Sequence, residues 1–436
     1  MRAAVAPFLI LLAMAAPGVA VGQTVDDLSA RIEAQNAVIQ QLLGRIETLE
    51  AAGAPETAAA VAISASDDAP APPPVALLPV ATAAIPRPAS EWTASLHGRV
   101  DADVWLADEA RSGSEIRRSR LTLDGGDRRS LAYVLSLEFA GGATTVLDAY
   151  LSIAAGERSA FRLGKQRVPF SLTGQTSENY AQLMERPVGL EPFIPGYAQG
   201  ASILTRGDRW SMQAGVYSRA QAEGGDVSDD DLLVGGRLTW APVLTADRFV
   251  HFGVAINQSR LASGGEVRLR QRPENHLAPF ALDSGLTPAD GQTRAGLEAA
   301  FGADAWGGLA EAVWTSIDRA VGGDPDYSGY AIETWWTLTG ESRPYRVDGG
   351  VFNRLTPRRS VEGGGPGAWQ IVGRISALDL DDDALEIGRM SAQALGLNWY
   401  LNGGARLMLN LSHSKTTTVL RQSEDTGVAL RAHVDW

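Results

Sequence analysis

The 436-residue sequence contains no cysteine. This absence excludes disulfide scaffolds, thiolate zinc sites, iron–sulfur ligation and cysteine nucleophiles. Only 5 histidines occur, and no two of them have a spacing typical of metal ligands. No Gly-x-Ser-x-Gly motif is found either, so no nucleophile and base can be paired from the sequence. We therefore expect no catalytic residue, no metal site and no cofactor.

Positive charge is also scarce. Lys and Arg number 38 against 51 Asp and Glu, which gives a formal net charge of −13 and argues against a nucleic-acid partner. Only Lys165 and Lys415 are lysines; all other basic residues are arginine, the better residue for binding oxyanions. A GC-rich genome would give the same imbalance. No run reaches the roughly 18 apolar residues that a membrane-spanning helix requires.

Residues 1–22 are typical of a secretory signal peptide. The positively charged start, Met1-Arg2, precedes an apolar stretch at residues 5–16. Small residues follow, so that cleavage after Ala20 and cleavage after Gly22 both fit the pattern. We therefore predict an exported protein.

Residues 23–50 have the 3–4 spacing of a coiled coil, and residues 51–90 form an Ala/Pro-rich linker. A lone amphipathic helix is the alternative for the first segment. The β-branched/Leu pattern favours a coiled coil of two helices. Three helices would associate if a trimeric domain held them together at high effective concentration. The positions on which the coiled coil depends are Val25, Leu28, Ile32, Gln35, Ile39, Leu42, Ile46 and Leu49.

From residue 96 onward, apolar residues recur at every second position, which indicates β-strands. Leu395, Leu397 and Trp399, for example, share one face and Asn398 lies on the other. A soluble sandwich can show the same alternation. Repeated full charges on the polar face, together with segments of about 10 residues, favour a transmembrane barrel. Only a closed barrel leaves no sheet edge exposed to hydrocarbon.

Short turns alternate with longer polar links, and we predict an all-β, 16-stranded antiparallel transmembrane barrel within residues 91–436. Long links are expected, among other places, at 167–198, 260–292, 380–389 and 416–425. Residues 346–355 look like a strand but are predicted to be an extended periplasmic segment; counting them gives the alternative of eighteen strands. The predicted strands are 96–106, 116–124, 130–139, 145–155, 159–166, 199–206, 209–219, 231–241, 248–259, 293–302, 306–318, 328–340, 368–379, 390–401, 404–415 and 426–436.

Six short motifs along the chain resemble those of the phosphate-selective porin O and P family, and they occur in the order expected for that family. The resemblance covers roughly residues 96–436. It implies trimeric, sixteen-stranded outer-membrane porins whose lumen selects anions, with phosphate or polyphosphate as the solute of the best-known members. The motifs are residues 148–150, 164–170, 184–186, 339–345, 367–376 and 395–402.

The link at residues 167–198 follows the fifth predicted strand and resembles the porin loop that folds into the lumen. Its prolines would stiffen a constriction, and it carries Arg167 and Arg186. A surface loop held by an internal Glu–Arg pair is the alternative. We hypothesise that this third external loop narrows the channel.

Alternation places a series of arginines on the lumen face, where rings of Arg attract anions. The alternative is that these arginines pair across strands with Asp101, Asp103, Glu138 and Asp148 and only stabilise the wall. Lys165 points outward by strict alternation unless a bulge at Gly164 turns it inward. The pore-lining candidates are Arg99, Arg118, Arg120, Arg162, Lys165, Arg167, Arg186, Arg237, Arg374, Arg406 and Arg431.

These observations predict an outer-membrane diffusion channel for small anions, including phosphate or polyphosphate. The expected partners are the anionic solutes, outer-membrane lipid and two further copies of the chain in a homotrimer. The N-terminal segment is expected to be periplasmic, where its coiled coil could contact the cell wall. The scarcity of lysine and the acidic loops weaken the assignment to phosphate. The alternative function is a general or cation-tolerant porin that acts mainly as an envelope tether.

Overall fold

The computed structural model describes residues 92–436 except 109–110, 128 and 219–230. The predicted signal peptide, coiled coil and linker lie outside the described residues. Within the described part, no helix is long and apolar enough to cross a bilayer.

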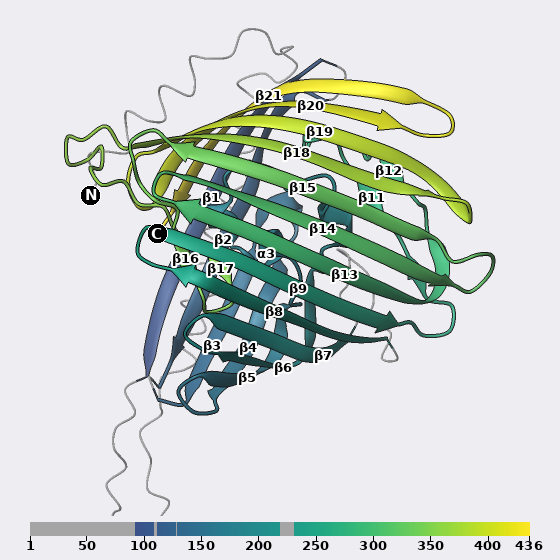
Figure 1. Cartoon of the computed structure of the whole chain (residues 1–436), viewed down its shortest axis with the longest axis horizontal. Coiled ribbons are helices and arrows are strands. Elements are labelled where there is room, and N and C mark those ends of the chain that lie inside the picture. Colours follow the sequence, from purple (N-terminus) through teal and green to yellow (C-terminus); the bar gives the residue numbers. More distant parts are fainter. Residues whose placement is uncertain (1–91, 109–110, 128, 219–230) are drawn as a thin grey trace, which may run out of the picture. The chain divides into compact units, whose positions relative to one another are not determined.

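Sixteen antiparallel strands form a closed barrel, because the last strand pairs with the first (Figure 1). The sheet has 17 members only because the two-residue strand β10 (Glu266–Val267) joins β13. The prediction of sixteen strands is confirmed. The strands are β1 (Thr93–Ala107), β2 (Gly113–Gly126), β3 (Leu131–Glu138), β4 (Thr145–Ala154), β5 (Ser159–Arg167), β6 (Tyr197–Arg206), β7 (Trp210–Ser218), β8 (Leu232–Leu244), β9 (Arg248–Arg260), β13 (Thr287–Ala303), β14 (Trp306–Arg319), β15 (Asp326–Thr337), β18 (Ala368–Asp382), β19 (Leu385–Tyr400), β20 (Ala405–Thr417) and β21 (Gln422–Asp435).

Apolar side chains lie on the outside of this barrel and polar side chains on the inside. On β19, Leu395 is 53% exposed, whereas Asn398 is completely buried. A soluble sandwich would show the opposite arrangement, with the apolar rows packed against one another. The exposed apolar rows are therefore the surface that faces lipid.

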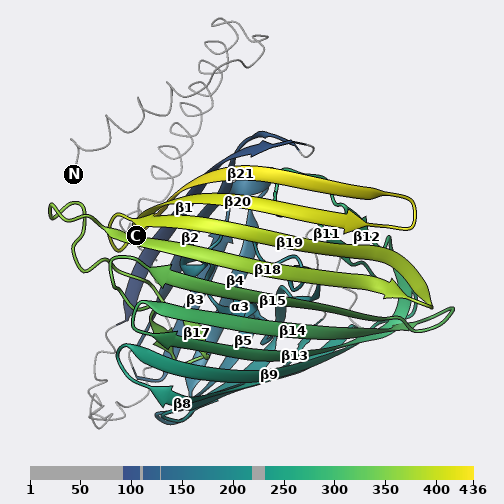
Figure 2. The same ribbon diagram turned by 45° about the horizontal axis from the view of Figure 1, so that its top comes forward.

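The barrel wall differs in height around its circumference. Strands β3–β7 contain 8–10 residues, whereas the barrel strands β13–β15 and β18–β21 contain 12–17. Figure 2 shows the long strands β18–β21 side by side on one side of the barrel. Part of their length was predicted to be loop: residues 380–389 and 416–425 are mostly strand. The link between β18 and β19 is a tight turn in which the Asp382 carboxylate accepts a hydrogen bond from the backbone N–H of Ala384 (2.8 Å).

Aromatic residues gather where strands meet the short turns, an end that we call the short-turn rim. Trp306 stacks on Trp336 with ring centroids 4.6 Å apart, and Trp369 stacks on Trp399 at 5.0 Å. Each of these side chains is adjacent to the end of its strand. Such a girdle is typical of the membrane–water interface of a barrel. We call the opposite end the loop rim.

Three links fold into the barrel instead of staying at its rims. They are residues 168–196, residues 261–286 with β10, β11 (Arg270–Gln271) and β12 (Leu282–Asp283), and residues 338–367 with β16 (Tyr345–Arg346) and β17 (Val351–Phe352). The last of these contains the strand-like segment 346–355, which forms part of a small two-stranded hairpin. It is not a barrel strand, so the eighteen-strand alternative is wrong.

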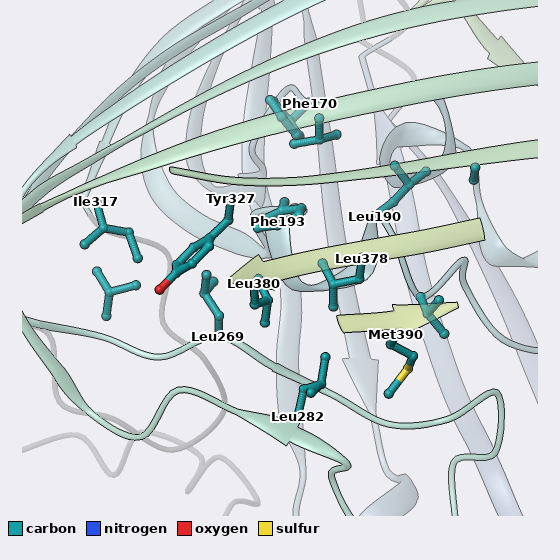
Figure 3. Packing of buried hydrophobic residues seen from close by; sticks show 14 of the residues in the cluster. Phe170, Leu190, Phe193, Leu269, Leu282, Ile317, Tyr327, Leu378, Leu380 and Met390 are labelled. Carbon is teal, nitrogen blue, oxygen red and sulfur yellow. The ribbon is translucent and has the colours of Figure 1, made fainter. Parts of the chain in front are cut away.

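The first two links pack against the inner wall through apolar side chains (Figure 3). Phe170, Leu190 and Phe193 from the first link are completely buried. Leu269 and Leu282 from the second link belong to the same cluster. The lumen is therefore partly filled by a core of its own.

Candidate permeation site

The link at residues 168–196, which we call loop L3, begins at an anchor on β14. The Glu311 carboxylate accepts hydrogen bonds from the Ser171 hydroxyl (2.6 Å) and from the backbone N–H groups of Leu172 (2.8 Å) and Thr173 (2.9 Å). The Thr173 hydroxyl donates a fourth hydrogen bond to it. These donors lie at the start of the short helix α3 (Leu172–Gln175). One buried carboxylate thus fixes where L3 leaves the wall.

The middle of L3 is held by its backbone. Successive carbonyl groups of residues 180–184 accept hydrogen bonds from side chains of the wall and of the 338–367 link, which keeps this stretch across the lumen. Pairs of this kind join Tyr180 to Arg343 (3.2 Å), Ala181 to Arg406 (2.6 Å), Gln182 to Asn398 (2.8 Å) and Met184 to Arg431 (2.9 Å).

The carboxylates of L3 lie among guanidinium groups. Glu178 pairs with Arg118 (2.7 Å) and Arg186 (2.9 Å), with Arg99 and Arg120 both at 3.7 Å. Burial by itself would raise the pKa of Glu178, but these cations, Arg118 first, hold that pKa well below its usual range. The carboxylate is therefore ionised throughout the physiological pH range.

Glu185, the next carboxylate of L3, is in a similar position. It lies 3.5 Å from both Arg117 and Arg431. Burial opposes its ionisation, yet the nearby cations, of which Arg117 contributes most, lower the pKa of Glu185 to about 2. L3 is therefore docked as a polyanion on a basic surface.

The junction between β1 and β21, which we call the closure seam, contains a cluster of buried, closely paired charges. Arg431 makes two hydrogen bonds to Asp103, at 2.7 and 2.6 Å. His433 contacts Asp101 at 2.6 Å, and Arg99 contacts the same carboxylate at 2.5 Å. All of these side chains are buried. The seam closes the barrel and supports L3 at the same time.

Most of the arginines predicted to line the pore thus have carboxylate partners. The expected partners Asp101, Asp103 and Glu138 account for four of them, whereas the other three pair with glutamates that were not predicted. Arg237 pairs with Glu298 at 2.7 Å. Arg374 contacts Glu274 and, at 3.6 Å, Glu333. Arg406 has no carboxylate partner in the described part of the chain, and its guanidinium lies 5.7 Å from the ring centroid of Tyr400. The paired set is Arg99, Arg118, Arg120, Arg186, Arg237, Arg374 and Arg431.

A different arrangement is found on β5, where three cations form what we call the basic wall. Within residues 92–436 as described, Arg162, Lys165 and Arg167 have no carboxylate within 4.0 Å. Arg162 lies over the ring of Tyr150 at 5.1 Å. Arg167 donates to the Gly174 carbonyl and to the Tyr197 hydroxyl, both at 2.7 Å.

The irregularity expected near Lys165 is present in another form. Gly164 has φ of +126°, and a side chain there would approach the Ala149 carbonyl oxygen to 2.2 Å. Only glycine fits such a position. The pairing of β5 with β4 and β6 continues without a shift of register, so there is no β-bulge. Lys165, next to this glycine, is half-buried.

A cavity of about 270 Å³ lies between L3 and the wall formed by β1–β6. Arg99, Arg120 and Arg167 contribute three guanidinium groups to its lining, and Asp148 contributes a carboxylate. We call this cavity the basic chamber. The rest of its lining consists of His97, Gly98 and hydroxyl and amide groups from Thr122, Ser136, Gln175, Ser177, Asn179 and Tyr197. Such groups can replace the hydration shell of a small oxyanion.

A second cavity, of about 190 Å³, contains basic residues that the sequence analysis missed. Arg270 and Arg272 place their guanidinium groups 4.1 and 3.8 Å from the ring centroid of Phe280. The alternation of Arg268, Arg270 and Arg272 was a signal for this site, but it lay in a region predicted to be a surface loop. We call this cavity the vestibule.

The vestibule also contains an unusual carboxylate. Burial raises the pKa of Glu274 to about 7, although its partner Arg374 lowers that pKa. Glu274 is therefore only partly ionised near neutral pH. The charge of the vestibule depends on pH for this reason.

The comparisons with known proteins agree with this geometry. The sequence profile described as "Phosphate-selective porin O and P" matches residues 96–436. The chain belongs to the phosphate-selective porin O and P family. A porin is a channel in the outer membrane and not an enzyme.

Among relatives of this porin, Porin O of Pseudomonas aeruginosa is 24% identical over 384 residues, which cover 77% of this chain and 86% of that protein. An uncharacterised protein of Caulobacter vibrioides is 30% identical over 326 residues, 72% of this chain. The match spans 65% of the Caulobacter protein's own length.

Solved structures support the fold alone, because their sequences are distant. A loop-deletion mutant of OmpT, an outer-membrane protein of Vibrio cholerae, has a TM-score of 0.54 at 12% identity and covers 79% of this chain and 99% of the mutant. A trimer form of OmpT has a TM-score of 0.51 at 11% identity, with 79% and 99% coverage.

Proposed function

We propose that this porin is a diffusion channel for small anions, phosphate among them, and that L3 narrows its lumen. The observation that carries the proposal is the excess of cations at the basic chamber. Arg167 lines that chamber without a carboxylate within 4.0 Å. The family and the relationship to Porin O support phosphate as a solute.

Whether a cation of the lumen attracts anions or only stabilises the barrel wall depends on whether a carboxylate lies next to it. A guanidinium paired with a carboxylate has little field beyond a few ångströms, whereas an unpaired one attracts anions over about a Debye length, roughly 8 Å at physiological salt. Arg162, Lys165 and Arg167 occur within six residues of one strand. Of these three, Arg167 lines the basic chamber, together with Arg99 and Arg120 and one carboxylate, Asp148. An anion in the chamber therefore meets a locally positive surface.

The net charge of −13 does not contradict this proposal. Asp324, Asp326 and Asp383 are exposed at the loop rim, with Asp381 and Asp382 beside them. Salt screens such exposed charges beyond about 8 Å. The total charge is therefore a poor guide to the charge of the lumen.

The neutralised arginines favour a second candidate, a general porin that tolerates cations and serves mainly as an envelope tether. In that case the coiled coil at residues 23–50 would contact the cell wall, and the barrel would be its anchor. We keep the anion channel as the first proposal because the basic wall would have no function in a neutral channel.

Reconstitution of the full chain in a planar bilayer tests both candidates. In a KCl gradient, the reversal potential of an anion channel lies close to the equilibrium potential of chloride. Added phosphate reduces the chloride current. Cation preference would overturn the first proposal. An absence of conductance in a well-inserted preparation would favour the tether.

We also propose that three copies assemble in the outer membrane with outer-membrane lipid around them, and that the N-terminal segment is periplasmic. The fold shared with OmpT, of which a trimer form exists, supports the assembly. Chemical crosslinking of the full chain in membranes, followed by crosslinking of the isolated 23–50 peptide, tests it. A monomer in the first experiment would contradict the trimer.

A further inference from the structure

A small cavity lies beside L3, lined also by residues of β2, β14, β15, β18, β21 and the 338–367 link. It measures about 50 Å³, and its lining includes Gln182, Glu333, Arg343 and Arg374. A smaller cavity of about 20 Å³ shares Gln182 and Arg343 with it. Neither residue lines the basic chamber. This site is therefore distinct from the chamber that we propose for permeation.

Two buried side chains at this cavity have hydrogen-bonding atoms without a partner. Gln182 is 2% exposed, and neither its amide nitrogen nor its amide oxygen has a hydrogen-bond partner. Arg343 is 7% exposed, and its Nη1 atom also has none. Leaving such buried groups unsatisfied lowers the stability of the folded state. A polar occupant of the cavity would remove that cost.

The charges around the cavity favour an anion as that occupant. Arg343 and Arg374 share one carboxylate, Glu333, at 3.9 and 3.6 Å. The other partner of Arg374 is Glu274, which is only partly ionised near neutral pH. Burial lowers the pKa of Arg343 to about 10, which shows how incompletely its charge is compensated. The lining as a whole has five arginines and three glutamates, so positive charge exceeds negative charge at this point. They are Arg118, Arg186, Arg343, Arg374 and Arg431 against Glu178, Glu185 and Glu333.

We propose that a halide-sized inorganic anion binds between the Gln182 amide and the Arg343 guanidinium and fixes L3 to the 338–367 link. The volume exceeds the roughly 10–15 Å³ that a cavity needs to hold one water, so the cavity has room for chloride. The coupling to L3 is direct, because Nη2 of Arg343 donates to the Tyr180 carbonyl at 3.2 Å. The same guanidinium touches the anion and the loop.

Diffraction with bromide locates the anion without any substitution. Crystals of the full chain are grown in sodium bromide, and anomalous scattering is measured at the bromine edge. We expect a bromide peak within hydrogen-bond distance of Gln182 and Arg343. Density for water alone at this point, with no anomalous peak, would overturn the proposal.

Thermal unfolding gives an independent measurement in solution. The apparent Tm in sodium chloride is compared with that in sodium gluconate at equal ionic strength, with the heat-dependent gel shift of the barrel as readout. We expect chloride to raise the Tm by about 3 °C, in line with ligand binding to the folded state only. Equal Tm values in the two salts would count against a bound halide.

Two variants assign the effect to the cavity. Gln182→Leu removes both unsatisfied amide atoms at nearly constant volume, so we expect it to fold and to lose the chloride-dependent rise in Tm. Arg268→Gln removes a cation from an exposed pair with Asp283, and we expect it to keep that rise. If Gln182→Leu retains the full chloride effect, the proposed site is wrong. Arg343→Met should behave as Gln182→Leu does, but the conclusion does not depend on its folding.

Discussion

The closure seam and the basic wall use the same residue type for different purposes. At the seam, Arg431 is buried and makes two hydrogen bonds to Asp103, so its charge is compensated within 3 Å. On the basic wall, the partners of Arg167 are the Gly174 and Thr176 carbonyls and the Tyr197 hydroxyl, all of them uncharged. A guanidinium stabilises the fold where a carboxylate opposes it, and it remains available to a solute where none does.

The wall height follows the same division. Strand β5, which bears the basic wall, has 9 residues, whereas β1 and β21 at the seam have 15 and 14. L3 is attached to β5 and extends across to the seam, where its carboxylates are neutralised. The carboxylates of L3 thus serve to dock the loop at the seam. The excess of cations remains at β5, where L3 begins.

The largest expected effect is the loss of an ion pair at the closure seam. Arg431→Met leaves Asp103 buried without its partner and frees the Met184 carbonyl, so we expect a loss of about 3–5 kcal/mol in the free energy of unfolding. Urea titration of the folded barrel, followed by its gel shift, measures this loss. Lys415→Gln, which breaks an exposed pair with Glu424, is the control and should cost under about 1 kcal/mol. Equal losses in both variants would erase the distinction between seam and surface.

The next effect concerns the anchor of L3. Glu311→Gln replaces an acceptor of four hydrogen bonds by an amide that accepts fewer of them, and we expect a loss of about 2 kcal/mol in stability, since hydrogen bonds to charged groups contribute about 1.5–3 kcal/mol each. We also expect larger fluctuations of the single-channel current, because L3 is less firmly held. Single-channel recording measures these fluctuations. Current fluctuations no larger than those of the unaltered porin would show that the Glu311 anchor does not control the position of L3.

The basic wall should affect selectivity more than stability. Arg167→Gln keeps a donor for the Gly174 carbonyl but removes the charge. At about 4 Å in a water-filled lumen a unit charge contributes about 1 kcal/mol, so we expect the anion-to-cation permeability ratio to fall roughly fivefold. The reversal potential in a KCl gradient measures it. Arg268→Gln, outside the basic chamber, should leave the ratio unchanged, and a fall of similar size in that control would mean that the effect is not local.

The sequence predicted the barrel well because its alternation is a local property of each strand. It also predicted that Asp101 and Asp103 could be partners of the lumen arginines. It failed for residues 338–367, which enter the lumen: the burial of Phe352 against Trp335 depends on a contact that no periodicity reports. Arg270 and Arg272 were missed for the same reason. Which cations remain unpaired depends on where L3 docks, and that is decided by Glu311 and by the seam.

The smallest expected effect comes from protonation in the vestibule. Because burial raises the pKa of Glu274 to about 7, above its ordinary value near 4.5, the folded porin binds an extra proton between these values, and stability should fall as pH rises from about 4.5 to 7. Protonation also leaves Arg374 with only the shared Glu333. We therefore expect the anion-to-cation permeability ratio to increase, by about twofold or less, as pH falls from 8 to 6. Reversal potentials at the two pH values measure it.

Glu274→Gln is the matched variant for this pH effect. It should show the same permeability ratio at both pH values, and that ratio should be close to the one of the unaltered porin at pH 6, because the amide resembles the protonated acid in charge. If Glu274→Gln keeps the pH dependence, another group controls it. In that case the contrast between paired and unpaired cations would have to be drawn without the vestibule, on the closure seam and the basic wall alone.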